Sequence, residues 1–197
     1  MQQISYLLGR LVSDMELYVV RHGETNYNVQ DRYTGSADVP LNETGIKQAR
    51  ELAENLKDIT FDIIITSPLL RAKQTAEIIS SFHNVFPVEI QGFQERNLGI
   101  FEHLTVAETE EKFPKLRARQ CTRKIDDAPD GGETIREFDQ RIQREISQLC
   151  DTYGKKSVLL VCHSFVARVI NRQINALTFD EMHNFTLENG TYIKYNI

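Results

Sequence analysis

The chain has few cysteines, no long apolar run and no excess of basic residues. Cys121, Cys150 and Cys162 form no CxxC pair, which indicates neither a disulfide framework nor a cysteine zinc site and favours a reducing cytoplasm. The longest apolar stretch, Val158–Cys162, is far shorter than the roughly 18–20 residues of a spanning helix, so we expect no membrane partner. Lysine plus arginine number 23 against 28 acidic residues, and the resulting net charge of −5 disfavours nucleic acid as a partner.

The 197 residues fit a single domain that follows a short extension. Residues 1–14 lack a basic start and a long apolar core, which argues against a signal peptide, and Met15 directly precedes the first strand-like run. We therefore predict an N-terminal extension over residues 1–14 and one domain over residues 15–197. A homodimer is left open.

Strand-like and helix-like segments alternate along the chain. Short apolar runs predict buried strands over residues 17–20, 61–65, 88–90 and 158–162. Apolar residues three or four positions apart, together with capping patterns, predict helices at Asn42, Ser67-Pro68, Thr105, Thr134 and Val166–Ile174. Asn189-Gly190 indicates a hairpin. The predicted fold is α/β, a three-layer sandwich with a mostly parallel central sheet, helices on both faces and an antiparallel hairpin at one edge.

Basic side chains follow three of the predicted strands. Arg21 and His22 follow the first, Arg71 lies one helical turn beyond the second, and His163 follows the strand over residues 158–162. Because ligands bind at the carboxyl ends of such strands, we expect these four groups to gather there. Their mutual repulsion favours an anionic ligand, and a phosphoryl group suits guanidinium forks. A neutral imidazole can attack phosphorus directly, so this chemistry requires no metal ion or cofactor.

Several short motifs follow one another over nearly the whole chain. They are Arg21-His22-Gly23-Glu24-Thr25 with Asn28, Gly35-Ser36-Ala37-Asp38-Val39-Pro40-Leu41 with Gly45, Ser67-Pro68-Leu69-Leu70-Arg71-Ala72 with Gln74-Thr75-Ala76, Glu95 with Gly99 and Glu102, Gly131-Gly132-Glu133-Thr134, and Val161-Cys162-His163. In this order and spacing the chain resembles the histidine phosphatase superfamily, the phosphoglycerate mutase-like proteins. The resemblance implies a mostly parallel sheet flanked by helices.

The resemblance also implies a role for individual residues. His22 resembles the nucleophile that becomes phosphohistidine, and Glu95 resembles the acid that protonates the leaving oxygen and later activates water. Arg21, Arg71 and His163 resemble the phosphate-binding pocket. The expected substrate contacts are Asn28, Thr34, Gly35 and Ser164. Ser164 replaces the usual glycine, which restricts the approach of the backbone to the phosphate. Tyr27, Thr34 and His103 also depart from the common pattern, and for these three neutral variation is favoured over a changed leaving-group side of the pocket.

The expected function is metal-independent hydrolysis of a phosphomonoester on a small phosphorylated metabolite. The segment between Tyr33 and Leu41 resembles α-ribazole phosphatases and broad-specificity phosphatases, and sugar-phosphate activity also fits the length. A 2,3-bisphosphoglycerate-dependent phosphoglycerate mutase is the first alternative, but the short chain between Glu95 and His163 favours a pocket open to water. A catalytically silent phosphate-ester-binding protein is the second alternative.

Other residues receive structural interpretations. His83 and His183 are expected at the surface, and Cys162 in the core. A metal site made of His22, His163 and Glu95 is disfavoured because the neighbouring arginines repel a cation. A solvated helix face is favoured over a ligand role for the basic residues Lys115, Arg117, Arg119, Arg123 and Lys124.

Overall fold

The structure is a computed structural model that describes residues 14–197. The predicted extension over residues 1–14 lies outside the described residues except for Asp14. Within the described part of the chain, no helix combines the length and apolar character needed to cross a membrane.

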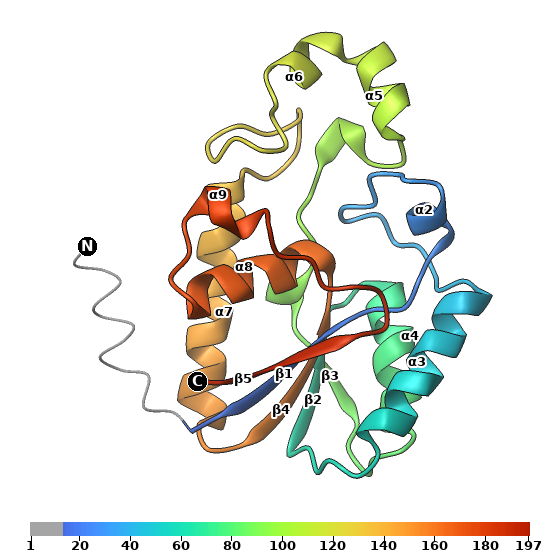
Figure 1. Cartoon of the computed structure of the whole chain (residues 1–197), viewed down its shortest axis with the longest axis vertical. Helices are drawn as coiled ribbons and strands as arrows, with labels where there is room; N and C mark the ends of the chain where they lie inside the picture. The colour runs from blue at the N-terminus through green and yellow to red at the C-terminus, as the bar shows by residue number, and fades with distance from the viewer. Residues whose placement is uncertain (1–13) are drawn as a thin grey trace.

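A five-stranded sheet forms the centre of the protein, in the order β3-β2-β4-β1-β5 (Figure 1). Its strands are β1 (Glu16–Arg21), β2 (Ile63–Thr66), β3 (Pro87–Glu89), β4 (Ser157–Cys162) and β5 (Tyr192–Asn196). The pairs β1–β4, β2–β4 and β2–β3 are parallel, whereas β5 runs antiparallel to β1 at one edge. The predicted mostly parallel sheet with an antiparallel edge is confirmed.

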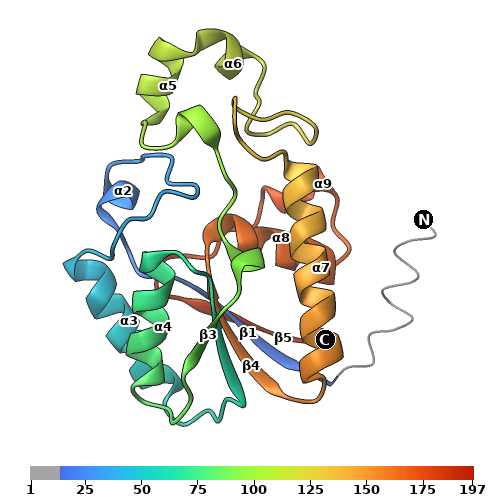
Figure 2. The same ribbon diagram turned by 180° about the vertical axis from the view of Figure 1, so that it is seen from behind.

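Two pairs of helices cover the two faces of the sheet (Figures 1 and 2). On one face lie α3 (Glu43–Leu56) and α4 (Leu70–Ser80), and on the other α7 (Ile135–Tyr153) and α8 (Ser164–Ile174). Successive residues of β1 alternate between them: Leu17 and Val19 pack with α7 and α8, while Tyr18 and Val20 pack with α3 and α4. Burial on both faces explains the unbroken apolar runs in the sequence.

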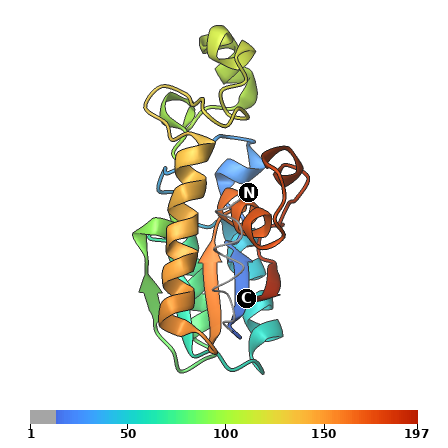
Figure 3. The same ribbon diagram turned by 90° about the vertical axis from the view of Figure 1, so that its left-hand side faces the viewer.

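Shorter elements lie near the carboxyl edge of the sheet. They are α2 (Asn26–Val29), α5 (Val106–Lys112), α6 (Pro114–Ala118), α9 (Phe179–Met182) and two 3-10 turns, η1 (Gln91–Phe93) and η2 (Gly99–Phe101). Figure 3 shows α5 and α6 standing beyond the rest of the fold as a cap. The predicted capping boxes at Thr105 and Thr134 start α5 and α7.

Two local predictions were wrong. Ser67 does not cap a helix, because α4 begins only at Leu70, and the Ser67 hydroxyl instead contacts His163. Asn189-Gly190 does not connect two hairpin strands: β5 pairs with the distant β1, and the Gly190 N–H donates to the carbonyl oxygens of Arg21 and His22. The second strand begins at Ile63 rather than residue 61, and the third covers Pro87–Glu89 rather than residues 88–90.

Candidate active site

The register of the sheet brings the two motif histidines together. Arg21 lies opposite Cys162 in the parallel pair β1–β4, so the next residue of each strand, His22 and His163, leaves the same edge side by side. Their ring centroids lie 5.2 Å apart. Sheet pairing alone therefore joins residues that are far apart in the sequence.

A cavity of about 420 Å³ opens at this edge. Eight of the nine predicted site residues line it, namely Arg21, His22, Asn28, Thr34, Gly35, Arg71, Glu95 and Ser164. The ninth, His163, is fully buried beside His22. The structure thus brings all nine residues to one place.

Two contacts fix the tautomer of His22. The carbonyl oxygen of Gly23 lies 2.6 Å from Nδ1 and can only accept, so Nδ1 carries the proton. The Arg71 Nε–H lies 3.2 Å from Nε2 and can only donate, so Nε2 presents its lone pair. Nε2 is therefore the nitrogen of this side chain whose lone pair can act as a nucleophile.

Burial keeps both histidines neutral. The pKa of His22 is lowered well below 6.5, first by burial and then by the positive charges of Arg71 and Arg21, while the Gly23 carbonyl opposes the shift. The pKa of His163 is lowered well below the same value by burial and then by Arg71 and His22. A neutral imidazole at His22 is the form that can attack phosphorus.

Arg71 is a buried arginine at the start of α4. Its terminal nitrogens donate to the carbonyl oxygens of Ala37 at 2.8 Å and Gly35 at 2.9 Å, in addition to the contact with His22. Burial lowers its pKa to about 10, so the side chain remains a cation at neutral pH. Gly35, which provides one of these two carbonyl oxygens, has a positive φ of 49°.

Arg21 and Asn28 lie beside His22. One Arg21 terminal nitrogen donates to the carbonyl of Leu187 at 2.8 Å, whereas its buried Nε has no partner among the described residues. The Asn28 Oδ1 accepts from the backbone N–H of Thr25 and lies in the capping box of α2, within reach of Asn189.

Glu95 faces the cavity from the loop between η1 and η2. Its Oε2 accepts the backbone N–H of Phe165 at 3.1 Å, and its Oε1 accepts that of Arg96 at 2.9 Å. The first of these N–H groups belongs to the first turn of α8, so the end of this helix fixes the orientation of the Glu95 side chain. Ser164 is the first residue of that helix, and Thr34 lies on the opposite loop.

Sequence reasoning missed several cavity residues. His183, which was expected at the surface, is half-buried and lines the cavity. His83, also expected at the surface, is half-buried too, but it packs on Phe61 away from the cavity. Arg123 also lines the cavity, against the preferred interpretation of a solvated face. Arg168 follows Ser164 by four residues on α8, and this spacing was an available signal. The other unpredicted lining residues are Arg32, Tyr33, Arg96, Leu98, Thr122 and Phe165.

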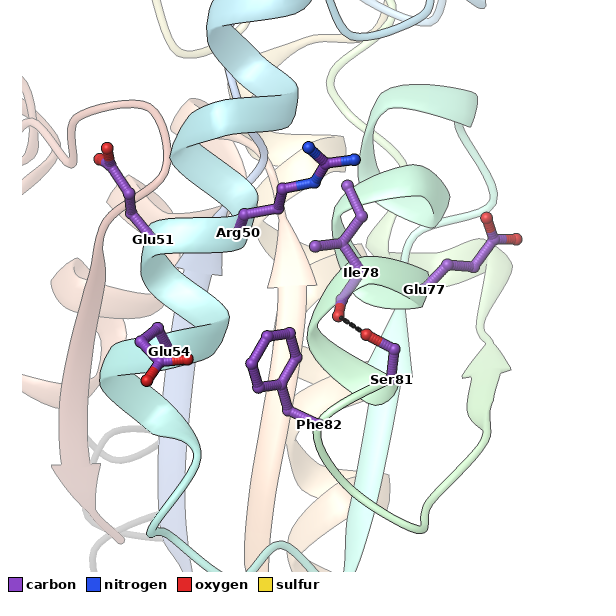
Figure 4. A pocket seen from close by; sticks show the side chains of 7 residues that line it. All are labelled: Arg50, Glu51, Glu54, Glu77, Ile78, Ser81 and Phe82. Carbon is purple, nitrogen blue, oxygen red and sulfur yellow. Dashed lines mark hydrogen bonds between the residues drawn. The ribbon is translucent and has the colours of Figure 1, made fainter.

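A second cavity lies between α3 and α4, away from all nine predicted residues (Figure 4). It measures about 630 Å³ and is lined by Glu51, Glu54 and Glu77, with Arg50 as its cation. Its acidic wall disfavours an anion, whereas the cavity at His22 is lined by arginines. No group of three or more metal-binding side chains occurs within residues 14–197.

The fold is that of an α/β protein whose arginine-lined cavity, beside a buried neutral histidine, has the chemistry to receive a phosphoryl group. The chain belongs to the histidine phosphatase superfamily (branch 1), whose family profile matches residues 17–197. It is 37% identical over 157 residues to an uncharacterized phosphatase, PhoE, of Bacillus subtilis, covering 80% of this chain and 76% of that protein.

Two further comparisons agree with this family. A 2,3-bisphosphoglycerate-dependent phosphoglycerate mutase of Gloeobacter violaceus is 30% identical over 177 residues, covering 87% of this chain and 81% of the mutase. The crystal structure of the alpha-ribazole phosphatase from Shigella flexneri superposes with a TM-score of 0.87 at 28% identity, covering 93% of this chain and 91% of that one.

Proposed function

We propose that this chain is a phosphomonoester hydrolase that acts on small phosphorylated metabolites through a phosphohistidine at His22. The observation that carries the proposal is the fixed tautomer of His22, whose Nε2 lone pair lies in a cavity lined by Arg21 and Arg71. The similarity to phosphatases across nearly the whole chain supports the same reaction type.

The first step transfers the phosphoryl group to the protein. His22 Nε2 forms a bond to phosphorus while the bond between phosphorus and the ester oxygen breaks. The protonated carboxyl of Glu95 gives its proton to that leaving oxygen. Arg21 and Arg71 hold the phosphoryl oxygens, and the Arg71 Nε–H turns from His22 Nε2 to one of them.

The second step releases inorganic phosphate. Glu95, now a carboxylate, takes a proton from a water molecule, whose oxygen attacks phosphorus as the bond to Nε2 breaks. The arginine cations neutralise the phosphoryl charge, so the proposed reaction is metal-independent. A cytoplasmic location and a homodimer stay predictions.

Phosphate release in the presence of a metal chelator tests this function. A panel of phosphomonoesters, including an α-ribazole phosphate and sugar phosphates, should give chelator-resistant turnover that His22→Ala abolishes. Glu95→Gln should slow substrates with poor leaving groups more than aryl phosphates, because only the former need a proton. Arg50→Lys, on the exposed surface of α3, is the matched control and should behave as the unchanged protein.

Rapid quenching with alkali identifies the intermediate. A phosphoryl group that remains on the unchanged protein but not on His22→Ala supports the covalent route. Interconversion of phosphoglycerates with no phosphate release would replace the hydrolase by the mutase. Absence of turnover in both assays would leave a phosphate-ester-binding protein.

A further inference from the structure

The cavity contains a second group of cations beside the group around His22. Arg123 comes from the loop after α6, Arg168 from α8 and His183 from the end of α9. The Arg168 guanidinium carbon lies 5.6 Å from the centroid of the Phe165 ring, and the His183 ring lies 6.3 Å from the same centroid. Phe165 thus holds two of the three basic groups against one wall.

Among the described residues, no carboxylate makes a direct ion pair with either arginine of this group, and Glu95 acts on Arg168 through its charge alone. Within residues 14–197, neither Arg123 nor Arg168 forms an ion pair, whereas the nearby Arg117 and Arg119 pair with Glu110 and Asp127. Arg168 Nε donates to the carbonyl of Phe185 at 3.0 Å, and the same part of the chain offers its terminal nitrogens no hydrogen bond. These nitrogens are therefore available to a ligand in the cavity.

A histidine lies among the positive charges of each group. The pKa of His22 is lowered by burial and then by Arg71 and Arg21. The pKa of His183 is lowered by burial and then by Arg168 and Arg123, with a smaller opposing effect of Asp180. Arg168 also lowers the pKa of Arg21, so the cations of the two groups repel each other.

Glu95 connects the two groups. Its charge raises the pKa of Arg21 in the first group and that of Arg168 in the second, against the effect of burial on both arginines. Its Oε2 also accepts the backbone N–H of Phe165, the residue whose ring contacts Arg168 and His183, so the carboxyl lies next to the second group. In the proposed reaction Glu95 protonates the leaving oxygen, which places the leaving part of the substrate on the side of the second group.

We propose that Arg123, Arg168 and His183 form a second anion-binding subsite, which receives an acidic group on the leaving portion of the substrate. This inference rests on the proposed hydrolase function and narrows its substrates to phosphomonoesters that carry another anionic group. The ligand chemistry is that of a phosphate or a carboxylate, whose oxygens accept charge-assisted hydrogen bonds from the arginines. Binding of such a group offsets the repulsion between the cations.

Matched substrates test the subsite. Glycerol 3-phosphate and 3-phosphoglycerate differ by a carboxylate, and fructose 6-phosphate and fructose 1,6-bisphosphate differ by a second phosphate. For each pair the measured quantity is the ratio of kcat/KM for the more acidic substrate to that for its partner. In the unchanged protein at least one ratio should exceed unity and should fall as salt concentration rises.

Arg123→Gln is the most direct variant, because this exposed side chain makes no hydrogen bond within the described residues and its loss leaves the fold intact. It should lower the ratio about tenfold or more, which corresponds to one hydrogen bond to a charged group. Arg168→Gln should lower it further, with a KM increase for the acidic substrate. Lys124→Gln is the control, because Lys124 is an exposed neighbouring cation that does not line the cavity, and it should leave the ratio unchanged.

The outcomes separate the two proposals. A reduced ratio in the carboxylate pair or in the bisphosphate pair supports the subsite and identifies the acidic group that it takes. Unchanged ratios in both arginine variants, with the unchanged protein still hydrolysing the substrates, overturn the subsite but leave the hydrolase. Failure of the unchanged protein to hydrolyse any phosphomonoester overturns the hydrolase itself.

Discussion

The Ser67 hydroxyl lies 2.7 Å from Nε2 of His163, where β2 and β4 end beside each other. The same oxygen accepts the backbone N–H of Leu69 at 3.3 Å. Among the described residues, His163 Nε2 is the acceptor that the hydroxyl proton of Ser67 can reach, so the hydroxyl donates to this nitrogen. Nδ1 of His163 must then carry the ring proton, and this buried nitrogen has no partner within the described part of the chain. In the proposed reaction, Ser67 thereby prepares His163 to donate from Nδ1 to a phosphoryl oxygen.

Ser67→Ala should therefore lower kcat/KM about 10- to 100-fold, in keeping with the loss of one preorganised donor. Nitrogen-15 shifts of the His163 ring should change from the Nδ1–H form to a mixture of tautomers. Ser67→Thr should restore the tautomer, and Ser81→Ala, which removes an exposed hydroxyl after α4, is the control. Unchanged ring shifts in Ser67→Ala would contradict this role even if activity fell.

The buried histidines make stability depend on pH. Both have folded-state pKa values below 6.5, so below that pH the unfolded chain binds protons that the native protein does not. Stability is therefore full above pH 6.5 and decreases as pH falls, by up to about 1.4 kcal/mol per pH unit for each histidine. Urea unfolding at pH values from about 7.5 down to about 5.5 measures this slope.

The variant that carries both His22→Gln and His163→Gln is the comparison. The variant retains the carboxylates, whose titration is common to both proteins. Its unfolding free energy should therefore depend less steeply on pH, because the contribution of the two histidines is lost. Equal slopes would show that the histidines are protonated in the native state. The acid limb of kcat/KM for the unchanged protein should likewise lie below pH 6.5, because His22 stays neutral there.

Arg71 binds its three acceptors with a planar fork that lysine cannot reproduce. Arg71→Lys should reduce kcat/KM at least about 100-fold and cost about 2–3 kcal/mol of unfolding free energy, since buried carbonyls lose their donors. Steady-state kinetics and urea unfolding measure the two effects. Arg50 is an exposed arginine on α3, so Arg50→Lys should change neither kcat/KM nor the unfolding free energy. If Arg71→Lys also left both quantities unchanged, the argument from the geometry of the guanidinium would be wrong.

The sequence predicts the convergence of Arg21, His22, Arg71 and His163 because a parallel sheet places the ends of its strands at one edge. It does not predict Ser67, because a serine before proline usually starts a helix, and its actual contact with His163 depends on strand pairing. The Asn189-Gly190 turn is a similar case. Its local pattern is typical of a hairpin. In the structure, however, the side-chain amide of Asn189 and the backbone N–H of Gly190 donate to the carbonyl oxygen of His22, which is 167 positions from Asn189.

The second cation group is harder to predict from sequence. His183 reaches the cavity because α9 packs on α8, and no spacing in the chain reveals that contact. Arg168 has a helical spacing to Ser164, but the same spacing describes many surface arginines. Only the packing on Phe165 distinguishes it.

Gly35 tests how the loop opposite His22 is supported. Its φ is 49°, and an added Cβ would lie 2.2 Å from Glu102 Oε1, the atom that accepts the N–H groups of Ser36 and Leu98. Gly35→Ala should therefore displace Glu102 and move the carbonyl that binds Arg71. Gly131 is a matched control, because its φ is 74° but an added Cβ would have no neighbour within 4 Å.

Gly131→Ala should cost only the strain of the left-handed backbone, about 1 kcal/mol. Gly35→Ala should cost more and should also lower kcat, since Arg71 loses its acceptor next to His22. Thermal unfolding and steady-state kinetics of both variants separate strain from contact. Equal losses of stability, with kcat unaffected in both, would mean that Glu102 yields to the new methyl group and that the loop does not position Arg71.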